Sequence, residues 1–204
     1  SSAYDPPSAE MVGLVNLSNG VMAGFFGKTL CLCEPYKPSA WPVDYRLNVD
    51  YDIVAVAPIG NGAIVLTTGF PYMLSGAHPS GMSIDRLDID QSCASKRSVA
   101  TNGNAVLYAS PDGVVAVSIS GSVNLTKDIF TKRQWTALGP QNMLCEIHDG
   151  RYVVFYDEGS FVLEVGAAKS GIVFGDLRTS ALFRDLESDT LYVASDEGTA
   201  AYES

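Results

Sequence analysis

A repeated pattern of turns and apolar runs constrains this sequence more than any other feature. Each of five copies has a polar turn, an apolar run, a second turn with Gly and another apolar run. The second-turn glycines follow one another at intervals of 39 to 46 residues, at Gly27, Gly69, Gly113, Gly159 and Gly198. Asn-Gly and Asp-Gly between apolar runs favour tight β-hairpins, because primed turns need φ > 0. The sequence therefore predicts five antiparallel hairpins.

Paired strands that recur about every 40 to 45 residues are typical of β-propeller blades. Each hairpin is expected to form the middle two strands of a four-stranded blade. Central runs such as residues 63–66 and 152–155 are apolar on both faces, as expected for sheets stacked face to face. The predicted fold is all-β, a propeller of about five antiparallel blades with up to four strands each. The expected blades cover approximately residues 10–51, 52–90, 97–138, 141–177 and 180–204.

One short helix is expected near residues 127–138, between the third and fourth blades. Thr126 is the predicted N-cap, and Gly139 followed by Pro140 is predicted to end the helix. Residues 10–17 are expected to supply a strand, either to their own blade or to another one. Because the chain lacks an initiator Met and its fifth copy lacks an outer strand, we expect residues 1–204 to be a single propeller domain from a longer chain.

Composition makes several classes of function improbable for this chain. Hydrophobic residues make up 47% and charged residues only 18%, the opposite of a disordered tail. The formal net charge is −10, so specific nucleic-acid binding is not expected, because an acidic chain repels a phosphate backbone. No apolar run reaches the roughly 18 residues of a membrane span, and no membrane insertion is expected. The four cysteines lack the spacing of a disulfide framework or a zinc site and are predicted to be buried thiols.

An acidic segment offers the candidate metal ligands Asp85, Asp88 and Asp90. Their oxygen atoms suit Ca²⁺, but the segment lacks the spacing and the central Gly of an EF-hand loop. The other interpretation is a charged outer strand that protects a sheet edge. We therefore predict no metal site, and no cofactor either, because the sequence contains no glycine-rich phosphate-binding loop.

Carboxylate pairs and histidines are the candidates for catalysis. Asp-Glu pairs stand at equivalent turns, at residues 157–158 and 196–197. Two carboxylates can hydrolyse a glycoside, but recurrence just before a turn Gly is also what turn preference alone produces. His78 and His148 lie in polar turns with no Ser or Cys nucleophile motif beside them. The sequence therefore predicts no enzyme and no catalytic residue.

A stretch rich in aromatic residues and Pro covers residues 34–45 and contains Tyr36, Trp41 and Tyr45. Exposed aromatic side chains bind sugars and protein partners. The other interpretation is a loop in which Trp41 packs over the end of a blade. Tyr36, Trp41 and Tyr45 are the predicted partner contacts.

Several segments resemble the blade ends of bacteriophage virion structural proteins. These are residues 25–35 (FFGKTLCLCEP), 40–42 (AWP), 108–113 (YASPDG), and 125–126 followed by Phe130, Thr131 and Trp135. The chain is similar to the propeller-bearing tail tubular (nozzle) proteins of short-tailed phages over roughly residues 11–177. Nozzle proteins are longer and carry further domains.

That resemblance implies a virion structural protein, a tail assembly module without catalysis. It implies synthesis in the cytoplasm of a bacterial host and a final location in the phage tail. The implied partners are other virion proteins and further copies of the chain in a ring.

Two other functions stay open. A carbohydrate- or receptor-binding propeller would repeat an exposed aromatic residue in each blade. Tyr72, Tyr108, Tyr152 and Tyr192 do recur, but within apolar runs that are typical of a core. A glycosidase-like propeller enzyme would bring carboxylates from different blades together on the central axis.

Overall fold

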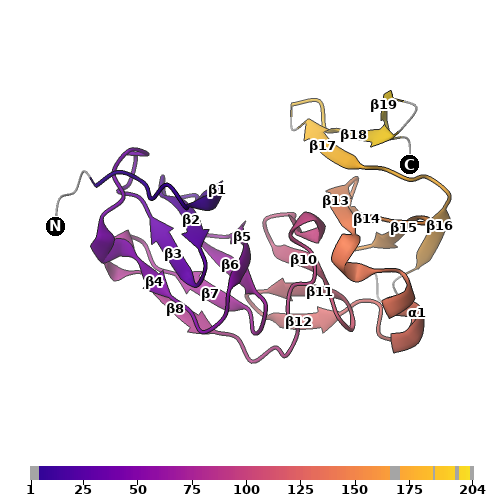
Figure 1. The fold of residues 1–204 in the computed structure, drawn as a ribbon, viewed down its shortest axis with the longest axis horizontal. Helices are drawn as coiled ribbons and strands as arrows, with labels where there is room; N and C mark the ends of the chain where they lie inside the picture. The colour runs from indigo at the N-terminus through magenta and orange to yellow at the C-terminus, as the bar shows by residue number, and fades with distance from the viewer. Residues whose placement is uncertain (1–4, 166–170, 186, 196–197, 203–204) are drawn as a thin grey trace. The chain divides into compact units, whose positions relative to one another are not determined.

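The computed structural model describes residues 5–165, 171–185, 187–195 and 198–202 (Figure 1). Within these residues the strands form five antiparallel sheets, four with four strands and one with three. The strands of each sheet are consecutive in the sequence, so the sheets follow one another along the chain. This arrangement confirms the predicted all-β fold class and its sheets of up to four strands.

The first two sheets occupy the N-terminal part of the chain. The first has the order β1 (Val12–Asn16), β2 (Met22–Phe26), β3 (Thr29–Leu32) and β4 (Leu47–Asn48). The second has the order β5 (Ile53–Ile59), β6 (Gly62–Thr67), β7 (Tyr72–Ser75) and β8 (Ser83–Arg86). Short 3-10 helices η1 (Val43–Tyr45) and η2 (Pro79–Gly81) precede β4 and β8.

The other three sheets occupy the C-terminal part. The third contains β9 (Ala100–Thr101), β10 (Ala105–Ser110), β11 (Gly113–Ser118) and β12 (Gly121–Asn124). The fourth contains β13 (Leu144–His148), β14 (Arg151–Tyr156), β15 (Gly159–Glu164) and β16 (Ile172–Gly175). The fifth contains β17 (Ala181–Asp185), β18 (Thr190–Ser195) and β19 (Gly198–Ala201). The 3-10 helices η3 (Lys96–Ser98) and η4 (Pro140–Asn142) precede β9 and β13.

The chain divides into two compact units. Unit 1 comprises Ser1–Cys93, Gly103–Val106 and Val117–Gly121. Unit 2 comprises Ala94–Asn102, Leu107–Ala116 and Ser122–Ser204. The first two sheets therefore belong to unit 1 and the last two to unit 2, while the third contributes residues to each.

The predicted hairpins form the middle of their sheets. The pairs β2–β3, β6–β7, β10–β11 and β14–β15 each have a further strand on both sides. β1 pairs with β2, so residues 10–17 supply a strand to their own sheet, one of the two expected arrangements. The fifth sheet places only β17 beside its hairpin, β18–β19.

The turn between β13 and β14 shows why Asp-Gly marks a hairpin. His148 pairs with Arg151, which leaves a two-residue loop of Asp149 and Gly150. Their φ angles are 50° and 72°, as a type I′ turn requires. The physical basis of the repeat is therefore local turn chemistry.

The helix starts later than the sequence predicts. α1 spans Lys132–Ala137, and its N-cap is Thr131, which forms a reciprocal capping box with Gln134. The prediction of Thr126 as N-cap was wrong, because its hydroxyl oxygen accepts a hydrogen bond of 3.0 Å from the Val114 amide. Gly139 has the left-handed conformation expected after a helix end, with φ of 67°.

Each unit has its own apolar core. In unit 1, Leu30, Leu32 and Ile64 are fully buried on the middle strands. In unit 2, Tyr152 and Phe155 of β14 are equally buried. Burial of both faces of these strands explains why their sequences show continuous apolar runs rather than alternation.

The four cysteines are buried free thiols, as predicted. Burial raises the pKa values of the Cys31 and Cys33 thiols, which favours their neutral form. Of the helices in the described residues, none is both long and apolar enough to cross a membrane.

Candidate functional site

Tyr36 is an exposed aromatic residue in a left-handed backbone conformation. Its exposed fraction is 81% and its φ is 59°. This conformation costs an L-residue with a bulky side chain roughly 1–2 kcal/mol. Backbone hydrogen bonds hold the segment, from the Tyr36 amide to the Gly20 carbonyl at 2.8 Å and from the Lys37 amide to the Glu34 carbonyl at 3.0 Å.

The ring of Tyr36 lies against the backbone of Gly20. A Cβ atom at position 20 would lie 2.4 Å from Cε1 of Tyr36, which is closer than any real contact. Gly20 has a φ of 73°, so it is suited to this position by conformation as well as by size. The backbone thus supports one part of the ring and leaves the rest in solvent.

Tyr45 lies on a neighbouring segment that is bonded to the same loop. Its hydroxyl donates a hydrogen bond of 2.9 Å to the Glu34 carboxylate. That hydrogen bond is the largest cause of a raised Tyr45 pKa, with desolvation second. The Tyr45 ring meets the His78 ring edge-on, with the ring centroids 6.0 Å apart. Beside Tyr45, Val43 exposes 52% of its surface.

These four residues, Tyr36, Val43, Tyr45 and His78, are named here the tyrosine surface. His78 is the N-cap of η2, and its side chain accepts from the Ser80 amide. The segments that carry the tyrosine surface all belong to unit 1. Of the three predicted contact residues, Tyr36 is exposed, whereas Tyr45 is half-buried and packs partly against the core of unit 1.

The prediction that Trp41 is a partner contact was wrong, because its side chain is buried. Its exposed fraction is 3%, and its indole N–H donates a hydrogen bond of 2.8 Å to the Pro38 carbonyl. The loop folds back so that the Glu34 amide also bonds to the Ala40 carbonyl, at 2.8 Å. Trp41 therefore belongs to the apolar core of unit 1, which agrees with the other interpretation of the sequence, in which it packs over the end of a blade.

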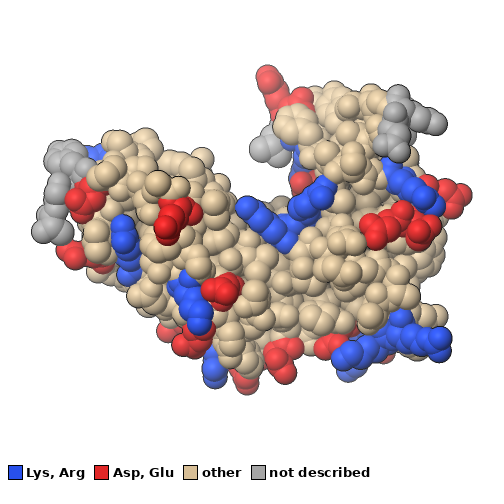
Figure 2. Space-filling model, in the orientation of Figure 1, with Lys and Arg blue, Asp and Glu red and all other residues tan. Residues whose placement is uncertain are grey.

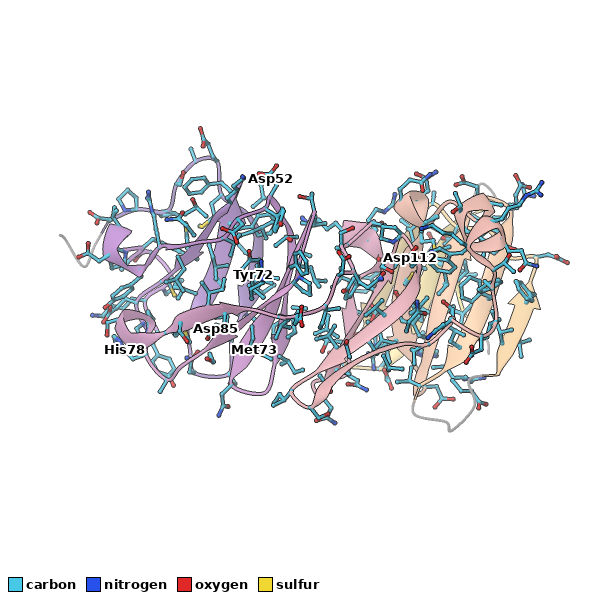
Figure 3. The ribbon with its side chains drawn as sticks, turned by 90° about the horizontal axis from the view of Figure 1, so that it is seen from below. Asp52, Tyr72, Met73, His78, Asp85 and Asp112 are labelled. Atoms are coloured by element: carbon cyan, nitrogen blue, oxygen red, sulfur yellow. The ribbon has the colours of Figure 1, made fainter. Side chains whose placement is uncertain are left out.

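The acidic segment shows no metal-site geometry. Asp85 lies on β8, the outer strand of the second sheet, where Figure 3 labels it. Its carboxylate accepts a hydrogen bond of 3.1 Å from the Ser83 hydroxyl. Throughout the part of the chain that the structure describes, no three His, Cys, Asp or Glu residues come together to hold a metal ion, so Asp85, Asp88 and Asp90 do not form a ligand cluster.

A pocket in unit 2 was not predicted from the sequence. It has a volume of about 510 Å³ and is lined by residues that include Asn142, Leu144, Tyr156, Asp157, Asp176 and Ser195. These residues come from the end of η4, from β13, from the turn between β14 and β15, from the link between β16 and β17, and from the end of β18. Of these lining residues, the sequence analysis singled out only Asp157, as part of a repeated Asp-Glu turn.

The predicted carboxylate pairs have different outcomes. Asp157 lines the pocket, while Glu158 forms an ion pair of 3.0 Å with Arg178. The second pair, Asp196 and Glu197, lies outside the described residues.

His148 ends β13, where its ring meets the Tyr202 ring edge-on at 6.3 Å between centroids.

Charges of both signs are spread over the face shown in Figure 2. On the face shown in Figure 2, basic and acidic side chains are interspersed over the sheets. No extended basic stripe of the kind that follows a nucleic-acid backbone is visible on that face.

Comparison with known proteins identifies the fold. No family model matches the sequence, and no match was found among curated proteins. The extracellular domain of a hybrid two-component system from B. thetaiotaomicron is similar, with a TM-score of 0.63, 10% identity, and coverage of 100% of this chain and 28% of that one. AztD from Citrobacter koseri gives a TM-score of 0.59 at 12% identity, covering 94% of this chain and 55% of that one. The Pan2 WD40 domain of Neurospora crassa gives 0.58 at 9% identity, covering 94% and 61%.

These similarities show that the sheets are those of a β-propeller. The chain spans less than two thirds of the length of each of these three structures. None of the three is a phage tail protein. The comparisons therefore support the predicted fold and give no support to the predicted role in a phage tail.

Proposed function

We propose that this chain is a non-catalytic β-propeller module that binds a protein partner through the tyrosine surface. One observation carries the proposal, namely that Tyr36 is exposed in a backbone conformation that is unfavourable for a bulky side chain. Burial does not compensate that strain, because the side chain is mostly in solvent. Strained residues cluster where function maintains them, and Tyr is enriched among the residues that dominate protein interfaces.

The neighbouring groups suit such a role. The exposed apolar side chain of Val43 adds contact area beside Tyr45. The Tyr45 hydroxyl is fixed by Glu34, so little side-chain entropy is lost when a partner covers the ring. The tyrosine surface therefore combines two aromatic side chains, one of them fixed by a hydrogen bond, with the exposed apolar side chain of Val43.

A more specific version of this proposal is that the chain takes part in assembly of the tail of a phage virion. Its partners would be other virion proteins or further copies of this chain in a ring, after synthesis in the bacterial cytoplasm. This form of the proposal rests on the sequence resemblance to nozzle proteins.

Carbohydrate binding is the second candidate. It predicts one exposed aromatic residue in each blade at an equivalent position. Three of the recurring tyrosines, Tyr72, Tyr108 and Tyr152, have exposed fractions of 5%, 0% and 0%. Because they belong to the core, they do not form a repeated sugar-binding surface, and protein binding is the better proposal.

Photo-crosslinking tests the proposed function directly. The photoreactive residue p-benzoylphenylalanine is placed at position 36 and, as a matched control, at position 119, where Ile119 of unit 1 exposes 77% of its surface. Irradiation is carried out on the purified chain and on extracts of phage-infected and uninfected bacteria. We expect a discrete adduct from position 36 that is absent from position 119.

The identity of the adduct distinguishes the forms of the proposal. A crosslink between two copies, with a discrete oligomer by light scattering, supports a ring. A crosslink to another virion protein supports tail assembly. Equal labelling from both positions contradicts the proposal, as does no adduct at all. Hydrolysis of glycoside substrates that is lost in Asp157→Asn would contradict the non-catalytic role.

A further inference from the structure

We propose that the pocket of unit 2 binds an organic cation, a guanidinium or ammonium group carried on a flexible apolar stem. The pocket lies in unit 2 and the tyrosine surface in unit 1, so this inference is independent of the proposed docking function. Its volume of about 510 Å³ falls within the range of small-ligand sites, which is about 300–1,000 Å³.

Hydrogen bonds fix the walls of the pocket. The Asn142 side-chain amide donates a hydrogen bond of 3.1 Å to one oxygen of Asp157. The end of the link that leads into β17 is also held by hydrogen bonds, at Thr179 and Ser180. The Thr179 hydroxyl donates to the Ala194 carbonyl at 2.6 Å, and the Ser180 amide donates to the same oxygen at 2.9 Å. These parts of the wall are therefore held in place before binding, which lowers the entropy lost there on binding.

The charges of the pocket favour a cation. Asp157, Asp176 and Arg178 line it, and Arg178 is already paired with Glu158 at 3.0 Å. Within the described part of the chain, the Asp157 carboxylate accepts a hydrogen bond from the neutral amide of Asn142 and forms no ion pair, so its negative charge is not compensated there. Among the residues that the structure describes, no hydrogen bond or ion pair involves the Asp176 carboxylate. Neither carboxylate is therefore paired with a basic side chain of the described residues, and the net charge of −10 adds a long-range attraction for cations.

The other lining groups suit an apolar stem. Leu144, Leu177 and the ring of Tyr156 contribute to the wall. The Tyr156 ring packs against Phe161, with the ring centroids 6.2 Å apart, so its position is supported from the core. An aromatic face beside carboxylates is a typical environment for a guanidinium or ammonium group. A basic side chain of a polypeptide and a free alkylamine both have this chemistry.

NMR titration of the isotope-labelled chain tests the proposal. The probes are acetyl-Gly-Arg-Gly-amide, the same tripeptide with neutral citrulline in place of Arg, and agmatine. We expect chemical-shift changes at Tyr156, Asp176 and Ser195 with the Arg tripeptide and with agmatine, and none with the citrulline tripeptide. Tighter binding of the Arg tripeptide than of agmatine indicates a polypeptide side chain as the ligand, and the reverse order indicates a free amine.

A pair of matched variants separates the pocket from the general charge of the chain. Asp176→Asn removes an exposed carboxylate that forms no hydrogen bond or ion pair with the residues that the structure describes, so the variant is expected to fold normally. Asp128→Asn makes the same charge change at an exposed residue outside the pocket lining. We expect Asp176→Asn to weaken binding of the Arg tripeptide about fivefold and Asp128→Asn to leave it nearly unchanged.

Three outcomes would overturn the proposal: equal binding of the citrulline tripeptide, equal effects of the two variants, or shifts confined to residues outside the pocket. Tyr36→Asn is expected to bind the Arg tripeptide as the parent does. A failure of the cation site therefore leaves the docking function standing, and a failure of docking leaves the cation site standing.

Discussion

The Tyr36 amide donates a hydrogen bond of 2.8 Å to the Gly20 carbonyl, and the Tyr36 ring fills the space that a side chain at position 20 would need. Both residues have positive φ angles, 59° for Tyr36 and 73° for Gly20. An exposed aromatic ring is therefore held in place by backbone geometry rather than by the core. This relationship makes the two positions interdependent.

Gly20→Ala is expected to destabilise the chain by about 1–2 kcal/mol, because it adds strain at positive φ and displaces the Tyr36 ring. Denaturant unfolding of the parent and the variant measures the loss. In the Tyr36→Asn background the ring is absent, and the same substitution should cost less. Equal losses in both backgrounds would mean that the two positions are not coupled.

Tyr36→Asn is expected to keep or raise the melting temperature, because Asn tolerates the left-handed conformation better than Tyr. The variant should nevertheless lose the crosslinked partner of the parent chain when the photoreactive residue is moved to position 43. A clear fall in melting temperature would instead assign Tyr36 a structural role.

Gly113→Val is expected to destabilise the third sheet by roughly 2–4 kcal/mol. Gly113 has a φ of 148°, and a Cβ atom there would lie 2.5 Å from Asn124 Oδ1 and Thr126 Oγ1. Gly103→Val is the matched control, because Gly103 has a φ of 84° but no atom within 4 Å of an added Cβ. Thermal unfolding should rank Gly113→Val as the more damaging change. If the two variants melt together, crowding at Gly113 is unimportant.

Thr131→Ala is expected to cost about 1 kcal/mol, the typical loss of an N-cap hydroxyl. Thr126→Val should cost more, because Thr126 is 1% exposed and its loss leaves the Val114 amide without its acceptor. Urea unfolding of the two variants tests this order. The reverse order would mean that the hydrogen bond from the Val114 amide to the Thr126 hydroxyl contributes little to stability.

Glu146 makes stability depend on pH. Its pKa is raised above the ordinary value of 4.5, chiefly by desolvation, although the Ile147 amide, Arg184 and His148 oppose the shift. In the folded chain the Glu146 carboxyl group therefore keeps its proton at pH values where it has lost that proton in the unfolded chain. The free energy of unfolding consequently falls as the pH rises from 4.5 through the folded pKa of Glu146. Glu146→Gln removes this loss and is expected to be more stable than the parent at pH 7. The advantage should disappear below pH 4.5, and urea unfolding at both pH values measures it.

Asp185 provides a control of opposite sign. Hydrogen bonds from the Ser188 hydroxyl and the Glu187 amide lower its pKa below 3.8. The stability that they contribute is present above that pH and is lost on acidification. Asp185→Asn should therefore lose stability at pH 7, whereas Glu146→Gln gains it. The same sign for both variants would contradict the assigned causes.

The candidate sites show which functional residues can be predicted from their neighbours in the sequence and which cannot. Tyr36 and Tyr45 were found because aromatic residues in a Pro-rich loop are unusual. Trp41 has the same local signal, but the fold of the loop returns its indole to the Pro38 carbonyl. Whether an aromatic side chain is buried depends on what packs over it, and that information is not contained in its neighbours along the chain.

The turns and the apolar runs alone determined the all-β class and the order of the hairpins. These features are local, because φ preferences such as those at Asp149 and Gly150 act within a few residues, and consecutive strands pair through short turns. Tertiary structure alone decided that the Thr126 hydroxyl accepts a hydrogen bond from the Val114 amide of β11. It also decided that Asn142, Asp157 and Asp176 line one pocket. Those relationships arise where separate strands and links meet, so they depend on long-range packing that no short stretch of sequence encodes.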